Sequence, residues 1–257
     1  MLRRVVATRY VTPLREGGSL PAIVEADDDG LYVVKFRGAG QGPKALVAEL
    51  IVGELARALG LPVPDIVLVE LDAALADAEP DPEIQHIIRA SGGLDVGLDF
   101  LPGALPFNPV VGPAPSPELA ADVVWLDGLT TNPDRTVQNP NLLIWHGRLW
   151  LIDHGAAIYI HHTWRDADEH ARRPFDQISD HVLLPTAGSI VDADARLGAR
   201  AAAAIEDVVS AVPDAWLEPD DQVGGPDDQR RAYGDYLRRR LEAPRPFVEV
   251  AERARAA

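Results

Sequence analysis

The sequence contains no cysteine, and this absence excludes several kinds of site at once. Without thiols there is no disulfide, no thiolate-bound metal and no cysteine nucleophile. Long apolar runs are also missing: no stretch is long and apolar enough to cross a bilayer, and the N-terminus turns polar too soon for a secretory signal. We therefore expect a cytoplasmic protein that does not enter a membrane.

Positive charge is scarce in this chain. Against 40 acidic residues there are 24 lysines and arginines, which gives a formal net charge of -16 at pH 7. Nucleic acids and anionic membranes attract proteins through cationic surfaces, so we expect neither to be a direct partner. A polyphosphate would also be repelled unless a bound metal ion or a buried lysine met it locally.

Lysine is the rarer of the two strongly basic residues, because only Lys35 and Lys44 occur and all the others are arginines. In a sequence that uses arginine at nearly every basic position, a lysine is a candidate for a position that needs a compact ammonium group. For Lys44, in a turn rich in glycine and proline, this inference is weak. Lys35 lies in the apolar run at residues 31–36, where alternation places its side chain on one face of a strand. It either faces solvent there or reaches the phosphates of a nucleotide.

The N-terminal part of the chain alternates short apolar runs with tight polar turns. The runs at residues 5–14, 21–26 and 31–36 are rich in β-branched residues, which predicts an antiparallel meander. The turn between the first two runs holds Gly17 and Gly18. This pair is either an ordinary hairpin turn or a loop whose backbone N–H groups approach a phosphate.

Residues 43–60 follow a helical period, and this helix carries a glutamate with no local basic partner. Glu49 lies on the apolar side of the helix, whereas Glu54 has Arg57 three residues further on and is explained as a surface pair. A strand lysine followed by a helix with a half-buried glutamate suggests an ion pair. We therefore expect Glu49 to orient Lys35.

A proline-rich segment divides the chain. Residues 102–117 contain six prolines and no helical or strand period, which is typical of a semi-rigid linker. The segment separates a β-rich N-terminal lobe at residues 1–101 from a mostly helical C-terminal lobe at residues 118–257. In the second lobe, runs rich in alanine, arginine and leucine predict long helices near residues 186–211 and 230–256. The predicted fold class is α+β.

The most informative stretch of the chain lies at residues 132–155. Asp134 and Asn139 are five residues apart in a polar loop, and Asp153 follows the apolar run at residues 149–152 at a glycine turn. Each of these residues alone is also explained as a turn former. Together they supply two carboxylates and an amide, and Mg²⁺ takes a few such protein oxygens and completes its shell with phosphate and water.

The polar residues described above occur in the order that kinases use: Lys35, Glu49, Asp134, Asn139 and Asp153. The stretch Asp134-Arg135-Thr136-Val137-Gln138-Asn139 resembles the catalytic loop of phosphatidylinositol 3- and 4-kinases. The wider pattern resembles the bacterial HipA-like kinases. Three further motifs carry that second resemblance: Phe100-Leu101-Pro102-Gly103, His161-His162-Thr163-Trp164 and Asp180-His181-Val182-Leu183-Leu184-Pro185.

The resemblance implies a protein-kinase-like, two-lobed fold with ATP bound between the lobes. Lys35, oriented by Glu49, would then hold the α- and β-phosphates of ATP, and the loop with Gly17 and Gly18 would lie near the phosphates. Backbone groups near residues 99–101 would meet the adenine.

The resemblance also implies how the phosphoryl group would be transferred. Asp134 would accept the proton of the acceptor hydroxyl, while Asn139 and Asp153 would bind Mg²⁺. The acceptor would be a Ser or Thr of a protein or a hydroxyl of a small molecule. Catalysis would consist chiefly of positioning and charge stabilisation.

Other interpretations remain open at this stage. One alternative is a pseudokinase, a module that binds a nucleotide or a partner without turnover. A lipid kinase is another, although the acidic charge and the lack of a basic membrane-facing stretch count against it. His161, His162 and His170 suggest a transition-metal site, but their spacing matches no common metal motif. The other explanation is that they pack near the mouth of the active site.

Overall fold

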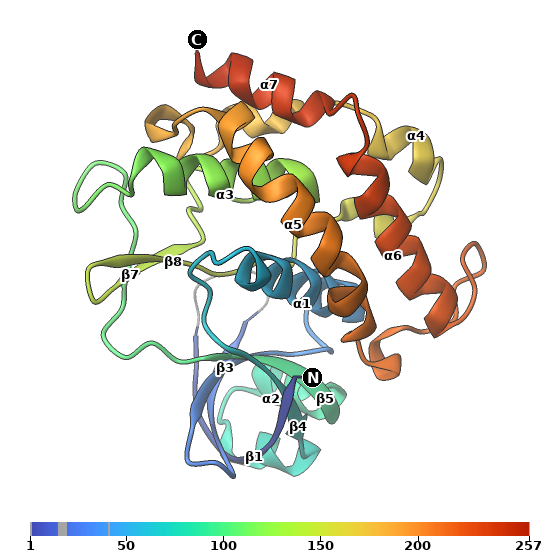
Figure 1. Cartoon of the computed structure of the whole chain (residues 1–257). Coiled ribbons are helices and arrows are strands. Elements are labelled where there is room, and N and C mark those ends of the chain that lie inside the picture. The colour runs from blue at the N-terminus through green and yellow to red at the C-terminus, as the bar shows by residue number, and fades with distance from the viewer. Residues whose placement is uncertain (1, 15–19, 41, 257) are drawn as a thin grey trace.

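The structure is a computed structural model that describes residues 2–14, 20–40 and 42–256 (Figure 1). Gly17 and Gly18, for which the kinase resemblance implies a place near the nucleotide phosphates, lie outside the described residues. None of the described helices is both long and apolar enough to span a membrane.

The N-terminal strands close into a small barrel in the order β1-β2-β3-β5-β4. Their bounds are β1 Arg3–Pro13, β2 Ala22–Ala26, β3 Leu31–Lys35, β4 Ile66–Leu71 and β5 Gly93–Asp99. The predicted antiparallel meander of β1, β2 and β3 is confirmed. Closure comes from a parallel pairing of β1 with β4, which the sequence does not indicate. A closed barrel leaves no long unpaired strand edge.

One carboxylate is buried in this barrel. Asp95 on β5 lies opposite Val69 on β4, whose side chain belongs to the apolar cluster of the barrel, so both face the same side of the sheet. One oxygen of Asp95 accepts a hydrogen bond from the backbone N of Arg37 at 2.6 Å, and the other has no partner among the described residues. Burial raises the pKa of Asp95 to about 7, with the contacts to Arg37 opposing the shift.

The variant Asp95→Asn is expected to be more stable than wild type at alkaline pH. The carboxyl group has a pKa of about 7 when folded, above its ordinary value of 3.8, so wild type loses stability as the pH rises through 7. The amide does not titrate. The gap in unfolding free energy between variant and wild type should widen by about 2–3 kcal/mol between about pH 5 and pH 8. Urea unfolding at both values measures it, and a gap of equal size at both would contradict the prediction.

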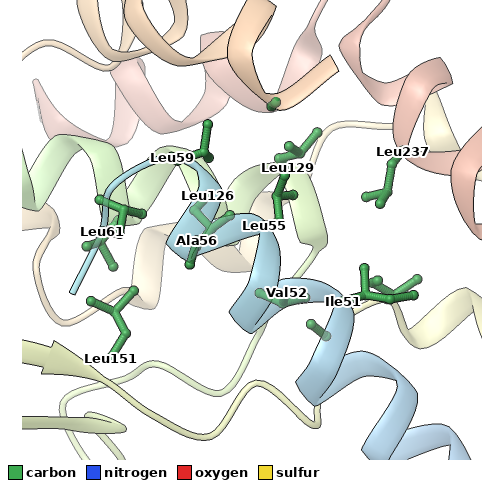
Figure 2. Close-up of a cluster of buried hydrophobic side chains, with 14 of the residues drawn as sticks. Ile51, Val52, Leu55, Ala56, Leu59, Leu61, Leu126, Leu129, Leu151 and Leu237 are labelled. Atoms are coloured by element: carbon green, nitrogen blue, oxygen red, sulfur yellow. The ribbon is translucent and has the colours of Figure 1, made fainter. Parts of the chain in front are cut away.

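Helix α1 (Pro43–Ala58) lies between the barrel and the helices that follow (Figure 1). It approaches β4 so closely that a Cβ on Gly53 would lie 2.4 Å from Cδ1 of Ile66. On its other side, apolar residues of α1 pack into the main core. Figure 2 shows this cluster, in which side chains of α1 and of the connection after it meet those of α3 (Pro117–Thr130), α6 (Pro226–Leu241) and β8 (Arg148–Leu151). Its labelled members are Ile51, Val52, Leu55, Ala56, Leu59, Leu61, Leu126, Leu129, Leu151 and Leu237. The helix is therefore fixed on both sides.

The C-terminal part of the molecule is mostly helical, and the predicted fold class is confirmed. Besides α3 and α6 it contains α4 (Ala167–Ala171), α5 (Ile190–Ser210) and α7 (Pro246–Arg255), while α2 (Pro82–Ala90) covers the barrel. Short 3-10 helices lie at η1 Ala73–Ala78, η2 Tyr159–His162, η3 Asp176–Asp180, η4 Leu184–Thr186 and η5 Asp214–Trp216. In α5 the apolar residues recur every three or four positions and face the core.

Two expectations about this part need correction. The single helix predicted near residues 230–256 is two helices, α6 and α7, because Pro244 and Pro246 interrupt the helical hydrogen bonds between them. The proline-rich segment was expected to lack strands. It contains the short strand β6 (Leu105–Pro106), which pairs with β7 (Leu142–Trp145) and extends the hairpin of β7 and β8. The segment is thereby tied to the sheet that carries the candidate site.

Candidate active site

Lys35, the last residue of β3, lies between two carboxylates from distant parts of the chain. Its Nζ donates to Oε2 of Glu49 on α1 at 2.7 Å and to Oδ1 of Asp153 at 2.5 Å. The side chain of Lys35 is 11% exposed. Burial alone would lower the pKa of Lys35, but the two carboxylates outweigh it and the pKa is raised. Lys35 is therefore a fixed cation at neutral pH.

Glu49 connects this cation to the backbone beside Asp153. The glutamate is fully buried, and its Oε2 also accepts a hydrogen bond from the backbone N of His154 at 2.6 Å. Its Oε1 has no partner among the described residues. Burial raises the pKa of Glu49, with Lys35 opposing the shift. The sequence-based expectation that Glu49 orients Lys35 agrees with this geometry.

Asp153 follows β8 in an unusual backbone conformation. Its φ of 56° lies in the left-handed region, which is costly for a residue with a Cβ. Its side chain is 39% exposed, so the carboxylate is accessible although one oxygen contacts Lys35. Burial alone would raise the pKa of Asp153, but Lys35 holds it below the ordinary value. An accessible, ionised carboxylate in a strained turn is a candidate metal ligand.

Asp134 and Asn139 face each other in the loop between α3 and β7. Oδ2 of Asp134 accepts from Nδ2 of Asn139 at 3.0 Å and from Nδ2 of Asn141 at 3.1 Å, while Oδ1 of Asn132 accepts from the backbone N of Asp134 at 3.1 Å. These contacts fix the orientation of the Asp134 carboxylate. Because Asn139 donates through its amide nitrogen, its amide oxygen remains for a cation.

Asn141 joins the two halves of the site. Its backbone O accepts from the backbone N of Ile152, the residue before Asp153, at 3.1 Å, and its side chain reaches Asp134. The structure thus brings Lys35 and Asp153 together directly and connects them to Asp134 and Asn139 through this residue. Sequence reasoning assigned no role to Asn141, although its place in the cluster of asparagines in this loop was a usable signal.

The donor set of the site fits a hard cation. Asp153, Asp134 and Asn139 offer only carboxylate and amide oxygens, which suit Mg²⁺ rather than a softer metal. Among the described residues, no group of three or more histidines and carboxylates has the arrangement of a complete metal site. A cation held here would therefore need phosphate oxygens and water to fill its shell.

The histidines near the site are engaged with protein groups. Nδ1 of His161 lies 3.1 Å from the hydroxyl of Tyr233 and its Nε2 lies 3.2 Å from Nε2 of His162, while Nδ1 of His170 lies 3.1 Å from the hydroxyl of Tyr236. Burial lowers the pKa of His161 to about 3. The geometry favours the packing interpretation of these histidines over the transition-metal interpretation.

Comparison with known proteins identifies the family. The family model of HipA-like kinases matches residues 8–242. No curated protein matches the chain. The crystal structure of a Helicobacter pylori proinflammatory kinase, CtkA, is 12% identical with a TM-score of 0.59, and the match covers 100% of this chain and 99% of that chain. The Golgi casein kinase with Mn and ADP bound is 13% identical with a TM-score of 0.51, covering 98% of this chain and 73% of that one.

These two structures share the two-lobed fold described above, with a β-rich N-terminal region and a helical C-terminal part. The family model extends over most of the sequence, including Lys35, the loop with Asp134 and the turn at Asp153. The chain belongs to the HipA-like kinase family.

Proposed function

We propose that this kinase transfers the γ-phosphoryl group of Mg-ATP to a hydroxyl of a protein Ser or Thr or of a small molecule. The observation that carries the proposal is the Lys35 ammonium fixed between Glu49 and Asp153. A buried cation beside an accessible carboxylate is what a phosphate with its counter-ion requires. The nucleotide would lie between residues 1–101 and residues 118–257.

Each charged group has a distinct role in this proposal. Lys35 would hold the α- and β-phosphates, and Glu49 keeps its ammonium in place. Asp153 and the amide oxygen of Asn139 would bind the metal ion, which when present neutralises charge on the transferred group. The Golgi casein kinase, which has the same fold, was crystallised with Mn and ADP, and this supports a divalent metal and a nucleotide here.

Asp134 would act as the base that accepts the proton of the acceptor hydroxyl. Its carboxylate is oriented by two amide donors, so it is positioned before the acceptor arrives. An open cavity of about 690 Å³ lies next to this loop, lined by residues of the loop and of the segment at residues 179–185, among them Thr136, Gln138, Ser179 and Leu184. A volume of this size can accept a small molecule or part of a peptide.

Thermal-shift titration with ATP, with and without Mg²⁺, tests the proposal on the wild-type protein. A ligand that binds only the folded state raises the melting temperature with its concentration. We expect ATP to stabilise the protein and Mg²⁺ to increase the effect, together with slow ATP hydrolysis or autophosphorylation. ATP binding with no turnover would instead support a pseudokinase. The absence of any ATP effect would contradict the proposal.

A further inference from the structure

Asp127, at the inner end of α3, is fully buried and holds side chains from several segments of the chain. Its Oδ1 accepts from Nδ2 of Asn132 at 3.0 Å. Its Oδ2 accepts from Nε of Arg135 at 2.6 Å and lies 2.9 Å from Nε2 of His181. Asn132 and Arg135 belong to the loop of Asp134, and His181 belongs to the segment that pairs with this loop at Thr136.

Arg135 extends these contacts to both neighbours of Asp153. Its NH1 donates to the backbone O of Asn141 at 2.5 Å and to the backbone O of Ile152 at 3.3 Å. Its NH2 lies 3.2 Å from Nδ1 of His154. Arg135 directly follows Asp134 in the chain, and Ile152 and His154 flank Asp153. One guanidinium therefore joins the residue after the proposed base to the backbone O of Ile152 and to the imidazole of His154, the two neighbours of the proposed metal ligand.

The two histidines in this cluster are neutral. A guanidinium can only donate, so Nδ1 of His154 must accept, and Nδ1 of His181 accepts from the backbone N of Leu183 at 3.0 Å. Burial, with Arg135 adding to it, lowers the pKa of His154 to about 3. Burial alone would raise the pKa of Asp127, but Arg135 and His181 hold it far below its ordinary value. The cluster thus contains one anion, Asp127, and one cation, Arg135.

A buried ion pair of this kind is a poor means of stabilising a fold, because removing each ion from water costs roughly several kcal/mol before the attraction between the two is counted. The ion pair contributes more to the geometry of the site than to the stability of the fold. Arginine presents donors in a rigid planar fork, so one side chain can fix several acceptors relative to one another. The acceptors here are the backbone O of Asn141, the backbone O of Ile152 and the ring Nδ1 of His154, and the last two belong to the residues that flank Asp153.

We propose that Asp127 and Arg135 are positioning residues of the phosphotransfer site, which hold the metal ligand Asp153 at a fixed place relative to the base Asp134. This inference rests on the function proposed above. In this proposal both residues act through others: Asp127 fixes the guanidinium, and the guanidinium holds the backbone O of Ile152 and the imidazole of His154.

The variant Arg135→Lys separates this role from a structural one. Lysine keeps the positive charge beside Asp127 but lacks the fork that reaches Ile152 and His154. The measurement is the Mg²⁺ concentration that gives half of the metal-dependent rise in melting temperature at fixed ATP. We expect it to rise about 10–100-fold, the usual effect of losing an outer partner of a metal ligand. The rise in melting temperature that ATP causes without Mg²⁺ should stay as in wild type.

Arg240→Lys is the matched control. Arg240 is equally buried, and its guanidinium also donates to backbone carbonyls, to the O of Leu129 and the O of Gly128, both at 2.7 Å. Among the described residues, the hydrogen bonds of Arg240 do not reach Asp153 or Asp134. The variant should lower the melting temperature and leave the Mg²⁺ midpoint unchanged.

A second variant, His154→Phe, covers the case in which Arg135→Lys does not fold. It removes the acceptor of NH2 and at the same time removes Nε2 of His154, which has no partner among the described residues. We expect a smaller shift of the Mg²⁺ midpoint in the same direction.

Distinct outcomes would overturn the inference. If Arg135→Lys has the Mg²⁺ midpoint of wild type, the positioning role is contradicted and the proposed function is not. His154→Phe decides in the same way if Arg135→Lys does not fold. An equal shift of the Mg²⁺ midpoint in Arg240→Lys would also contradict the positioning role. Loss of the metal-free ATP response in Arg135→Lys would show general damage instead. If wild type itself shows no Mg²⁺-dependent response to ATP, both the proposed function and this inference fail.

Discussion

The variant Asp153→Asn is expected to lose the Mg²⁺-dependent part of its stabilisation by ATP. The substitution keeps the shape of the side chain but removes the negative charge that would hold the cation. Among the described residues, Lys35 is left with Glu49 as its carboxylate partner. Several kcal/mol of charge stabilisation depend on the metal, so turnover should fall by at least about a hundredfold. Thermal-shift titration with Mg²⁺ at fixed ATP, together with an ATP hydrolysis assay, measures both effects.

Asp122→Asn provides the control for this experiment. Asp122 lies on α3, and its Oδ1 accepts from NH2 of Arg196 on α5 at 2.5 Å. The same chemical change there should leave the Mg²⁺ response as in wild type. If Asp153→Asn responded to Mg²⁺ as wild type does, Asp153 would not be a metal ligand.

The variant Asp134→Asn is expected to bind Mg-ATP and to turn it over about 10²–10⁴ times more slowly, the range for loss of a general base. An amide retains an oxygen that can accept from Asn139 and Asn141, so the loop should keep its conformation. It cannot take up the proton of the acceptor. Autophosphorylation or hydrolysis of γ-labelled ATP measures the rate, and the thermal shift with Mg-ATP shows whether binding is intact.

The two variants differ in what they should preserve. Asp153→Asn should lose the metal response, whereas Asp134→Asn should keep it and lose only turnover. An Asp134→Asn protein as active as wild type would exclude Asp134 as the base. Loss of nucleotide binding in that variant would place Asp134 at the nucleotide rather than at the acceptor.

The sequence was sufficient to predict the parts of the site that depend on local pattern. Alternation in β3 put Lys35 on one face of a strand, and the lack of a local partner singled out Glu49 on the next helix. The structure places their side chains 2.7 Å apart. The order of these residues with Asp134, Asn139 and Asp153, together with the motifs at residues 100–103, 161–164 and 180–185, was enough to predict the family and the fold class.

Long-range features could not be read in the same way. The pairing of β1 with β4 depends on how the barrel closes, and no local signal specifies it. Arg135 lies in a polar loop, where an arginine is expected to face water. Its burial depends on contacts with Asp127 and His154, which come from other segments of the chain, and the sequence does not show these contacts. Pro244 and Pro246, by contrast, were visible in the sequence and should have divided the last predicted helix.

The burial of α1 on both sides has a consequence for how this kinase can be controlled. Rotating or withdrawing the helix would expose Ile51, Leu55 and Leu59 to water, at a cost of roughly 1.5–3 kcal/mol for each side chain, and would also separate Glu49 from Lys35. A regulator that acted by displacing α1 would have to supply the free energy for exposing all three side chains and for separating the ion pair. We therefore expect α1, and with it the contact between Glu49 and Lys35, to stay in place while the activity of this kinase is regulated.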